Sequence, residues 1–316
     1  MSLQRYVIKR LLVMVPVLLG VTVITFFMVH LIPGDPIDYI TAFTDISPAQ
    51  KEAIRAEYGL DDPIYIQYID WVTNAAQLDF GESIITERAV SAEIMDRLPY
   101  TLLMGGMALG VALVTAIPTG IVAAYYEGTK IDEASRVFAL FGIAMPNFWL
   151  GLILILVFAS TLQMFPVLPP TAEGLLSVQM IVYTILPAIA LGTASTALLM
   201  RLMRSSMVEE LNKEYVTMAR AKGLPERTVI RKHVLKNSLI SVVTVTALQI
   251  AFLISGAVVV EIVFSYPGIG RLLVDRVAQR DFPVIQALVL IIGVSVLVMN
   301  LIADIVYAYL DPRIRY

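Results

Sequence analysis

Six stretches of predominantly apolar residues, each long enough to cross a bilayer, constrain this chain more than any other feature. They run at about 10–32, 101–125, 137–162, 181–203, 239–262 and 285–309, and a spanning helix needs about 20 such residues. Hydrophobic residues make up 58% of the 316 positions, and only 16% are charged. Because backbone groups inside a bilayer must be paired internally, these runs predict an all-α integral membrane protein with six transmembrane helices.

The first apolar stretch follows three basic residues, Arg5, Lys9 and Arg10, and extends from Leu11 to Ile32. A secretory signal peptide would have an apolar region of about 7–15 residues and then a small-residue cleavage site. This run is longer, and the sequence LIPGDP at its end is no such site. We therefore expect an uncleaved spanning helix.

The distribution of Lys and Arg between the loops predicts the orientation. The N-terminus carries three basic residues and no acidic one, and loop 205–238 is basic. Segment 33–98 carries thirteen Asp or Glu against four Lys or Arg. Six spans with both termini in the cytoplasm place the acidic segment outside and the basic loop inside. Three arginines between 271 and 280 depart from the rule, although two aspartates beside them partly offset their charge.

These patterns divide the chain into two parts. Residues 1–98 hold the first span and a partly helical extracytoplasmic insert, and residues 99–316 hold a five-helix core. The insert is too long for a plain loop. Ser47 suits a helix N-cap and Gly59 a helix end, so we expect a short helix between them.

A second helix of the insert is predicted by the stretch IYIQYIDWVTNAAQLDFG. Its aromatic residues Tyr65, Tyr68 and Trp71 are typical of a helix near the membrane interface. Pro99 then suits the first turn of the second span.

The polar interval 209–239 separates two apolar spans and holds the strongest local signal. Nine Lys or Arg lie between Arg201 and Lys236, against four Glu. Steps of three and four residues place Val208, Leu211, Tyr215 and Met218 on one helical face. Gly223 is suited to end this helix and Pro225 to begin another. An amphipathic helix, a tight turn and a second helix at a membrane surface call for a soluble partner.

Motifs of catalysis are missing from the sequence. It has no Cys and only two His, and it contains neither a phosphate-binding GxxxxGK[ST] loop, an HExxH pair nor a GxSxG elbow. The lone GxG at Gly268–Gly270 lacks the context of a nucleotide-binding loop, so we interpret it as a turn. We therefore expect that the chain is not an enzyme.

Polar groups inside the predicted spans are few, and charges there are costly and usually functional. We assign structural or gating roles to Glu261, Asn300 and Asp304. Glu261 is expected to cap or pair locally, with Arg271 or Arg276 as candidate partners, although a site for a coupling ion is the alternative. Asp304 is expected to pair with one of three arginines, namely Arg201, Arg204 or Arg313.

Small residues and prolines suggest how the spans pack. Gly106 and Gly110 form a GxxxG pattern in the second span, which favours close packing inside the chain, with dimerisation as the alternative. Pro187 and Gly192 interrupt the fourth span. Pro118, Pro146 and Pro187 are candidate kinks in three spans.

Several segments together resemble the permeases of ABC importers, and among them the peptide/nickel group in its first-permease (B-type) branch. The loop YVTMARAKGLPERTVIRKHVLKNSL carries the resemblance most clearly, and the other segments follow in the same order over nearly the whole chain: LIPGDP at 31–36, YGLDDPIYIQYIDW at 58–71, LDFGES at 78–83, AMPNFWLGLILILVF at 144–158, VVVEIVFSYPGIGRLL at 258–273, RDFPVIQA at 280–287 and NLIADIVYAYLDPRIR at 300–315.

The resemblance implies a type I importer fold in which this loop is the coupling helix that inserts into a separate ATPase. Ala219 and Gly223 match the small residue and fixed glycine of the family's loop. Thr217 stands where the broader family has Glu, and the loop does not end with Ile-x-Leu-Pro. Both departures resemble the peptide branch of the family. The implied coupling residues are Tyr215, Ala219, Arg220, Ala221, Gly223, Leu224 and His233.

The resemblance also implies partners: a second related permease, two cytoplasmic ATPases that bind the ATP and Mg, and an external substrate-binding protein. The chain itself would bind no cofactor, metal or nucleic acid. Candidate residues of the translocation path are Asn147, Ser195 and Gln249. The cargo would be di- or oligopeptides, with nickel, glutathione or oligosaccharides as alternatives. An ion-coupled secondary carrier is the alternative of another class, and a membrane-embedded hydrolase is a third.

Overall fold

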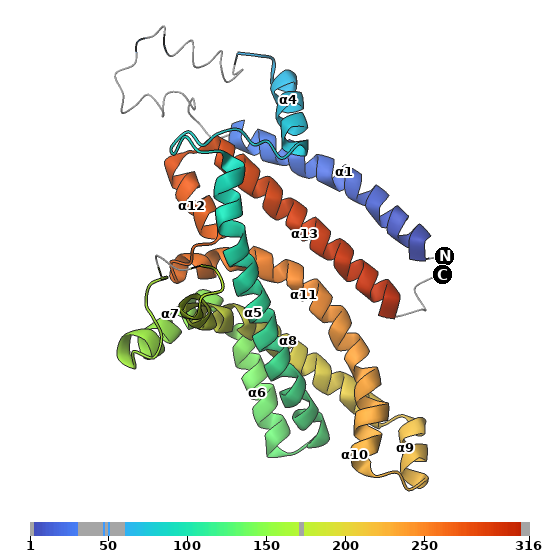
Figure 1. Ribbon diagram of the computed structural model, residues 1–316. Helices are drawn as coiled ribbons and strands as arrows, with labels where there is room; N and C mark the ends of the chain where they lie inside the picture. The colour runs from blue at the N-terminus through green and yellow to red at the C-terminus, as the bar shows by residue number, and fades with distance from the viewer. Residues whose placement is uncertain (1–2, 31–46, 48–49, 51–60, 171–173, 311–316) are drawn as a thin grey trace.

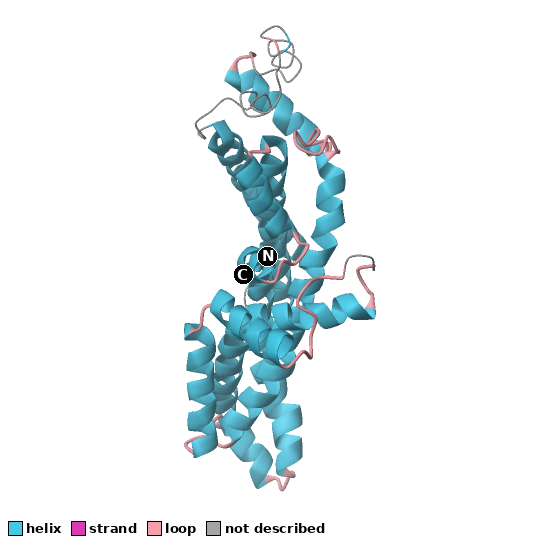
Figure 2. Ribbon diagram, turned by 90° about the vertical axis from the view of Figure 1, so that its left-hand side faces the viewer, coloured by secondary structure: helices cyan, strands magenta, loops and turns pink. Residues whose placement is uncertain are grey.

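The computed structural model describes residues 3–30, 47, 50, 61–170 and 174–310. Within these ranges the chain is helical apart from loops and one isolated β-bridge, between Glu82 and Ala89 (Figures 1 and 2). The helices are α1 (Leu3–His30), α4 (Ile64–Ala76), α5 (Val90–Tyr125), α6 (Lys130–Ala144), α7 (Asn147–Leu154), η1 (Ile155–Thr161), α8 (Val178–Leu211), α9 (Glu214–Ala221), α10 (Glu226–Thr228), η2 (Val229–Val234), α11 (Leu235–Val263), α12 (Ile269–Gln279) and α13 (Phe282–Leu310).

Five helical segments in the described ranges are long and apolar enough to cross a membrane, or six if one bent pair counts as a single span. This confirms the predicted all-α membrane fold. The bent pair is the predicted span 137–162, where α6 meets α7 and η1 at 102°. Met145 is extended, with ψ at 121°, as the residue before a proline prefers. The predicted kink at Pro146 is confirmed, and the bend divides the predicted span into two helical arms.

Helix α8 runs unbroken through Pro187 and Gly192, which the sequence had suggested would interrupt it. It is the most buried of the candidate spans. Gly192 lies against α5, where an added Cβ would come within 2.6 Å of the Ala108 carbonyl oxygen. The glycine therefore sets a close helix contact rather than a helix break.

The GxxxG pattern of α5 does not mediate packing against the described parts of the chain. A Cβ at Gly106 or Gly110 would meet nothing within 4 Å. The prediction of internal close packing there is wrong, because α5 turns other residues, such as Met104 and Ala108, toward α8 and leaves this face open.

Helix α5 begins at Val90, nine residues before the predicted start at Pro99. Its first turns are anchored, because Val90 and Ile94 are buried against α12 and α13 with Ile269 and Val284. Pro99 and Pro118 both lie inside this one helix.

The aromatic helix of the insert is confirmed as α4, which rests on α1. The ring of Phe26 lies 5.4 Å from that of Tyr68 and 5.9 Å from that of Trp71. The Tyr68 hydroxyl lies 2.8 Å from that of Thr22. The helix predicted between Ser47 and Gly59 falls mostly outside the described residues, although the Gln50 amide does donate to Ser47 Oγ at 3.3 Å, as an N-cap requires.

Helix α1 lies beside α13 in the bundle (Figure 1). Arg10 pairs with Asp304 at 3.0 Å and joins the two helices near one end. The predicted pairing of Asp304 with Arg201 or Arg204 is therefore wrong, and Arg313 falls outside the described residues. Arg204 instead binds Asp132, which holds α8 to α6. The cation that pairs with Asp304 thus comes from the N-terminal helix, whereas the sequence analysis expected it from the five-helix core.

Candidate functional site

The chain between α8 and α11 forms a compact helical turn at the end of the bundle opposite α12 (Figure 1). Helix α8 stops at Leu211, and α9 starts at Glu214 after two intervening residues. After Gly223, Pro225 caps α10, which continues through η2 into α11. The predicted sequence of short helix, tight turn and second helix is confirmed.

Gly223 makes the turn between α9 and α10. Its φ is +78°, in the left-handed region that favours glycine. Its amide donates to the Arg220 carbonyl at 2.9 Å, and the Leu224 amide donates to the Ala219 carbonyl at 3.4 Å. A Cβ on Gly223 would meet nothing within 4 Å. The glycine is therefore required by backbone conformation alone, and the space around it is open.

Two side-chain contacts hold this turn in shape. The Arg220 guanidinium reaches across the turn to the Glu226 carboxylate with two bonds, at 2.7 and 3.1 Å. The Tyr215 hydroxyl donates to Glu210 and accepts from Asn237 Nδ2 at 3.1 Å. Burial, followed by the hydrogen bond to Glu210, raises the pKa of the Tyr215 hydroxyl. These contacts tie α9 to both α8 and α11.

The apolar residues around α9 do not form the single face that the spacing predicted. Val216 and Ala219 are buried, and they pack with Val229 and Val234 of the following helices. Met218 is 60% exposed, and Val208 and Leu211 belong to α8 rather than to α9. The spacing that predicted one continuous apolar face crosses the break between these two helices, so that prediction is wrong.

The outward face of the turn is partly apolar. Met218 and Leu224 are exposed, and Ala221 and Gly223 lie beside them on the surface. His233 is half-buried, and its backbone carbonyl lies 3.3 Å from the Tyr215 hydroxyl. The predicted coupling residues thus divide into a supporting set, formed by Tyr215, Ala219, Arg220 and His233, and an outward set, formed by Ala221, Gly223 and Leu224.

Two of the three candidate path residues lie together. Gln249 of α11 donates to Ser195 of α8 at 3.0 Å. Ser195 is fully buried within the chain, whereas Gln249 is partly exposed. Asn147 begins α7, just after the bend at Pro146. Their role in a path stays a prediction.

Glu261 is buried at the end of α11, and it caps α12. Its carboxylate accepts from Thr101 Oγ1 at 2.6 Å and from the Arg271 amide at 2.9 Å. A Cβ at Gly268 would overlap this carboxylate, which explains the GxG turn. The local capping role is confirmed, but the partner is the backbone of Arg271, whose guanidinium bonds to the Ser265 carbonyl instead.

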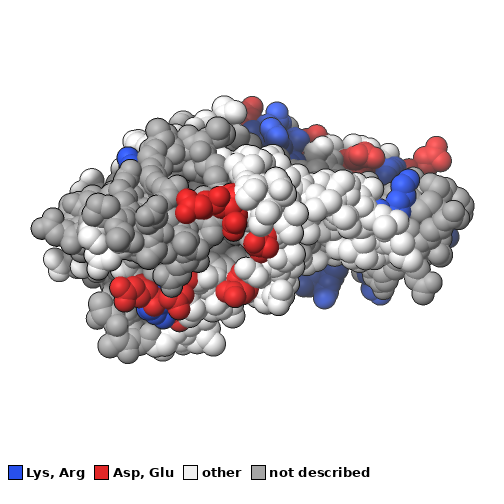
Figure 3. All heavy atoms as spheres, turned by 90° about the horizontal axis from the view of Figure 1, so that it is seen from above, with Lys and Arg blue, Asp and Glu red and all other residues white. Residues whose placement is uncertain are grey.

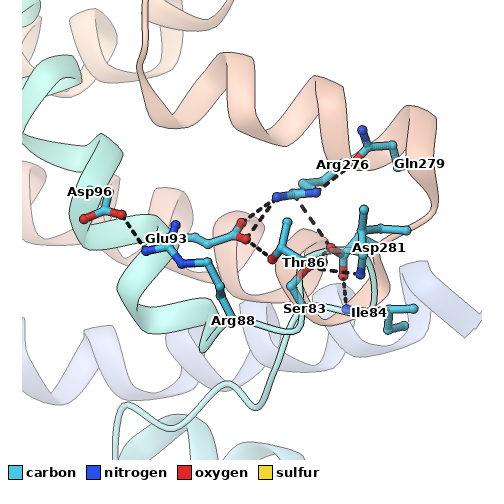
Figure 4. A network of polar contacts seen from close by, with 10 residues as sticks. Ser83, Ile84, Thr86, Arg88, Glu93, Asp96, Arg276, Gln279 and Asp281 are labelled. Atoms are coloured by element: carbon cyan, nitrogen blue, oxygen red, sulfur yellow. Dashed lines mark hydrogen bonds and ion pairs between the residues drawn. The ribbon is translucent and has the colours of Figure 1, made fainter. Parts of the chain in front are cut away.

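A buried polar network at the other end of the bundle escaped the sequence analysis (Figure 4). Arg276 of α12 donates to both oxygens of Glu93 at 2.8 and 3.0 Å. Asp281 accepts from Ser83 Oγ at 2.5 Å and lies 3.7 Å from Arg276. Arg276 is therefore no partner of Glu261. These residues lie up to 198 positions apart, and no local pattern links them.

The surface of this end is acidic where it is described. Residues 61–98 carry eight Asp or Glu and two Arg, and Figure 3 shows Asp and Glu side chains gathered on the face seen from above. Among the described residues, no group of three or more His, Cys, Asp or Glu could hold a metal ion. Asn300 is exposed on α13.

Comparison with known proteins places this arrangement in a family. Residues 3–105 match the N-terminal part of the membrane component of binding-protein-dependent transport systems, and residues 116–316 match the inner membrane component of these systems. The chain belongs to this family of ABC-transporter permeases, which are non-catalytic membrane subunits. Membership implies a multi-pass protein of the inner membrane that works with ATPase and substrate-binding partners.

Two curated relatives match over nearly their full length. The oligopeptide transport system permease protein AppB of Bacillus subtilis (strain 168) is 44% identical over 316 residues, which cover 98% of this chain and 99% of the relative. The glutathione transport system permease protein GsiC of Escherichia coli (strain K12) is 42% identical over 311 residues, with coverages of 98% and 99%. The resemblance inferred from the sequence motifs is confirmed.

Proposed function

We propose that this chain is the first permease of an ATP-driven importer of di- or oligopeptides. The observation that carries the proposal is the full-length similarity to an oligopeptide permease and a glutathione permease. Both named cargoes are short peptides with free carboxylates. Nickel and oligosaccharides, which the sequence left open, find no support in these relatives.

The chain would pair with a second, related permease to enclose the path. The open face of α5 supports this pairing, because Gly106 and Gly110 carry no side chain and a Cβ at either would meet none of the described residues within 4 Å. Small residues on an exposed face of a spanning helix permit a close contact with another helix. Gln249, Ser195 and Asn147 are the candidate residues along the path.

The turn between α9 and α10 would dock on one of two cytoplasmic ATPases, which would bind the ATP and Mg. Its supporting residues hold it rigid, and its outward residues offer an apolar contact with open space at Gly223. ATP-driven closure of the ATPases would pull this turn and, through α8 and α11, would tilt the bundle. Both termini would then lie in the cytoplasm, and residues 33–98 would face the external binding protein.

The test is ATP hydrolysis by the complex, co-purified and reconstituted in lipid with its binding protein. Short peptides or glutathione are expected to stimulate hydrolysis. Basal hydrolysis that neither cargo stimulates would overturn the peptide assignment and leave the transporter class. Uptake that follows an ion gradient without ATP would favour the ion-coupled carrier instead.

A further inference from the structure

A cavity of about 600 Å³ opens beside the buried network of Glu93 and Arg276, at the α12 end of the bundle. One wall is the first part of α5, and the other is α12. The rest of the wall includes three rigid, apolar residues, namely Pro169, Pro170 and Pro267. The volume falls within the range of about 300–1,000 Å³ that is typical of small-ligand sites.

The polar lining of the cavity comes mostly from one face of α5. Glu93, Asp96, Arg97 and Tyr100 follow the spacing that brings residues to the same side of a helix. Both acidic groups already have cationic partners. Glu93 binds Arg276, and Asp96 binds Arg88 at 2.9 Å.

Of the three arginines that line the cavity, Arg97 alone has no carboxylate partner among the described residues. Arg97 makes no hydrogen bond or ion pair with any described residue, and the Tyr100 hydroxyl has no hydrogen-bond partner among them either. In the wall, the Nε atom of Arg276 is buried without a hydrogen-bond partner within the described chain. The lining thus carries one positive charge in excess. Arg97 and Tyr100 offer donors that no described residue uses, whereas both carboxylates of the lining are already paired.

We propose that this cavity binds the free α-carboxylate of the peptide cargo, with the Arg97 guanidinium as its main partner and the Tyr100 hydroxyl as a second donor. This inference rests on the proposed peptide function. An arginine fork matches a carboxylate with two parallel hydrogen bonds. The Tyr100 ring also lines the cavity, so it can contact the rest of the peptide.

The shape of the site favours a small cargo over an acidic loop of the binding protein. The donors lie in a concave space walled by three prolines, whereas the described surface outside it is predominantly acidic and would repel an acidic partner.

The test compares uptake of a pool of tripeptides with uptake of the same pool amidated at its C-terminus. The complete complex is reconstituted in lipid vesicles, and uptake is expressed per peptide loaded on the binding protein. Arg97→Gln is expected to slow uptake of the free acids at least about tenfold, the usual effect of losing one charge-assisted hydrogen bond. The same variant should leave uptake of the amides unchanged.

Two variants control the result. Arg97→Lys keeps the charge but not the two-bond fork, and it should retain part of the preference for the free acids. Met95→Gln introduces the same side chain two residues away, where Met95 is 65% exposed and lies outside the cavity lining, and it should behave as the wild type.

An Arg97→Gln variant that takes up the free acids normally would overturn the site. Equal slowing of both pools would overturn it too, and would place Arg97 in docking of the binding protein. If the wild-type complex hydrolyses ATP but takes up neither pool, the proposed peptide function itself has failed.

Discussion

Replacement of Gly223 by tryptophan tests whether the α9–α10 turn couples ATP hydrolysis to transport. A non-glycine residue in the left-handed region costs roughly 1–2 kcal/mol. No further cost arises inside the chain, because a Cβ on Gly223 would meet nothing within 4 Å. The Gly223→Trp permease should therefore still fold and insert. The added ring would project from the turn into the space that the ATPase would occupy.

Gly128 offers a matched control. It lies in the turn between α5 and α6, its φ is +75°, and a Cβ there would also meet nothing within 4 Å. Gly128→Trp therefore imposes the same backbone strain and the same bulk at a different turn. Thermal unfolding should place the two variants within about 1 kcal/mol of each other, as independent surface changes of equal strain should be.

The assay measures uptake and ATP hydrolysis by both variants in the reconstituted complex. Gly223→Trp should lower uptake at least about tenfold, which corresponds to 1.4 kcal/mol of lost coupling. Hydrolysis should persist but no longer respond to the loaded binding protein. Gly128→Trp should transport normally. Equal uptake by the two variants would refute the docking role of the turn.

Three further substitutions test the packing and the polar contacts. Glu93→Gln should destabilise the permease by up to about 3–5 kcal/mol, because it removes the nearer of the two carboxylates beside the buried Arg276 and leaves only Asp281 at 3.7 Å. Adding Arg276→Gln should restore part of the thermal stability, and an unchanged melting temperature would contradict this. Gly192→Ala should cost about 1–3 kcal/mol through overpacking against α5, whereas Gly110→Ala should be neutral in the same melting assay; similar effects of the two would contradict the packing described. Tyr215→Phe should lower stability by about 1–2 kcal/mol. Because the pKa of this hydroxyl is raised above 10.0 in the folded state, the stability that it contributes should be constant from pH 6 to 9 and lost only above pH 10. Unfolding measured as a function of pH checks this.

The sequence predicted the elements that depend on local patterns. Spanning helices follow from apolar length, and the turn at Gly223 follows from a glycine and a proline two residues apart. The aromatic helix α4 was predicted because Tyr68 and Trp71 are typical of interface helices. Each of these features depends on neighbours in the chain.

The features that the sequence could not predict depend on contacts between distant segments. The glycines at 106 and 110 look like a packing motif, yet α5 turns them outward, and Gly192 makes the close contact instead. Asp304 pairs with Arg10 rather than with Arg204, because α1 lies beside α13. No local rule tells which of several arginines a carboxylate will meet.

The end of α9 shows the same limit on a smaller scale. The periodic spacing of Leu211, Tyr215 and Met218 suggested one continuous helix, but the chain breaks at 212–213. The break rotates α9, so Val216 and Ala219 face inward and Met218 faces outward. Of the residues that the spacing placed on one apolar face, only Met218 is therefore left exposed for a docking role, whereas Leu211 and Tyr215 are partly buried.

Cross-linking from Met218 tests the central claim most directly. The chain has no Cys, so Met218→Cys introduces a single thiol, and a bismaleimide with a short linker can join it only to a nearby thiol of a partner. Leu78→Cys, on the opposite end and 72% exposed, is the control. The account predicts an adduct with the ATPase from Met218→Cys, provided that the ATPase carries engineered thiols around its surface, and none from Leu78→Cys. If every such ATPase thiol fails to react with Met218→Cys in an actively transporting complex, the turn between α9 and α10 is not the coupling site.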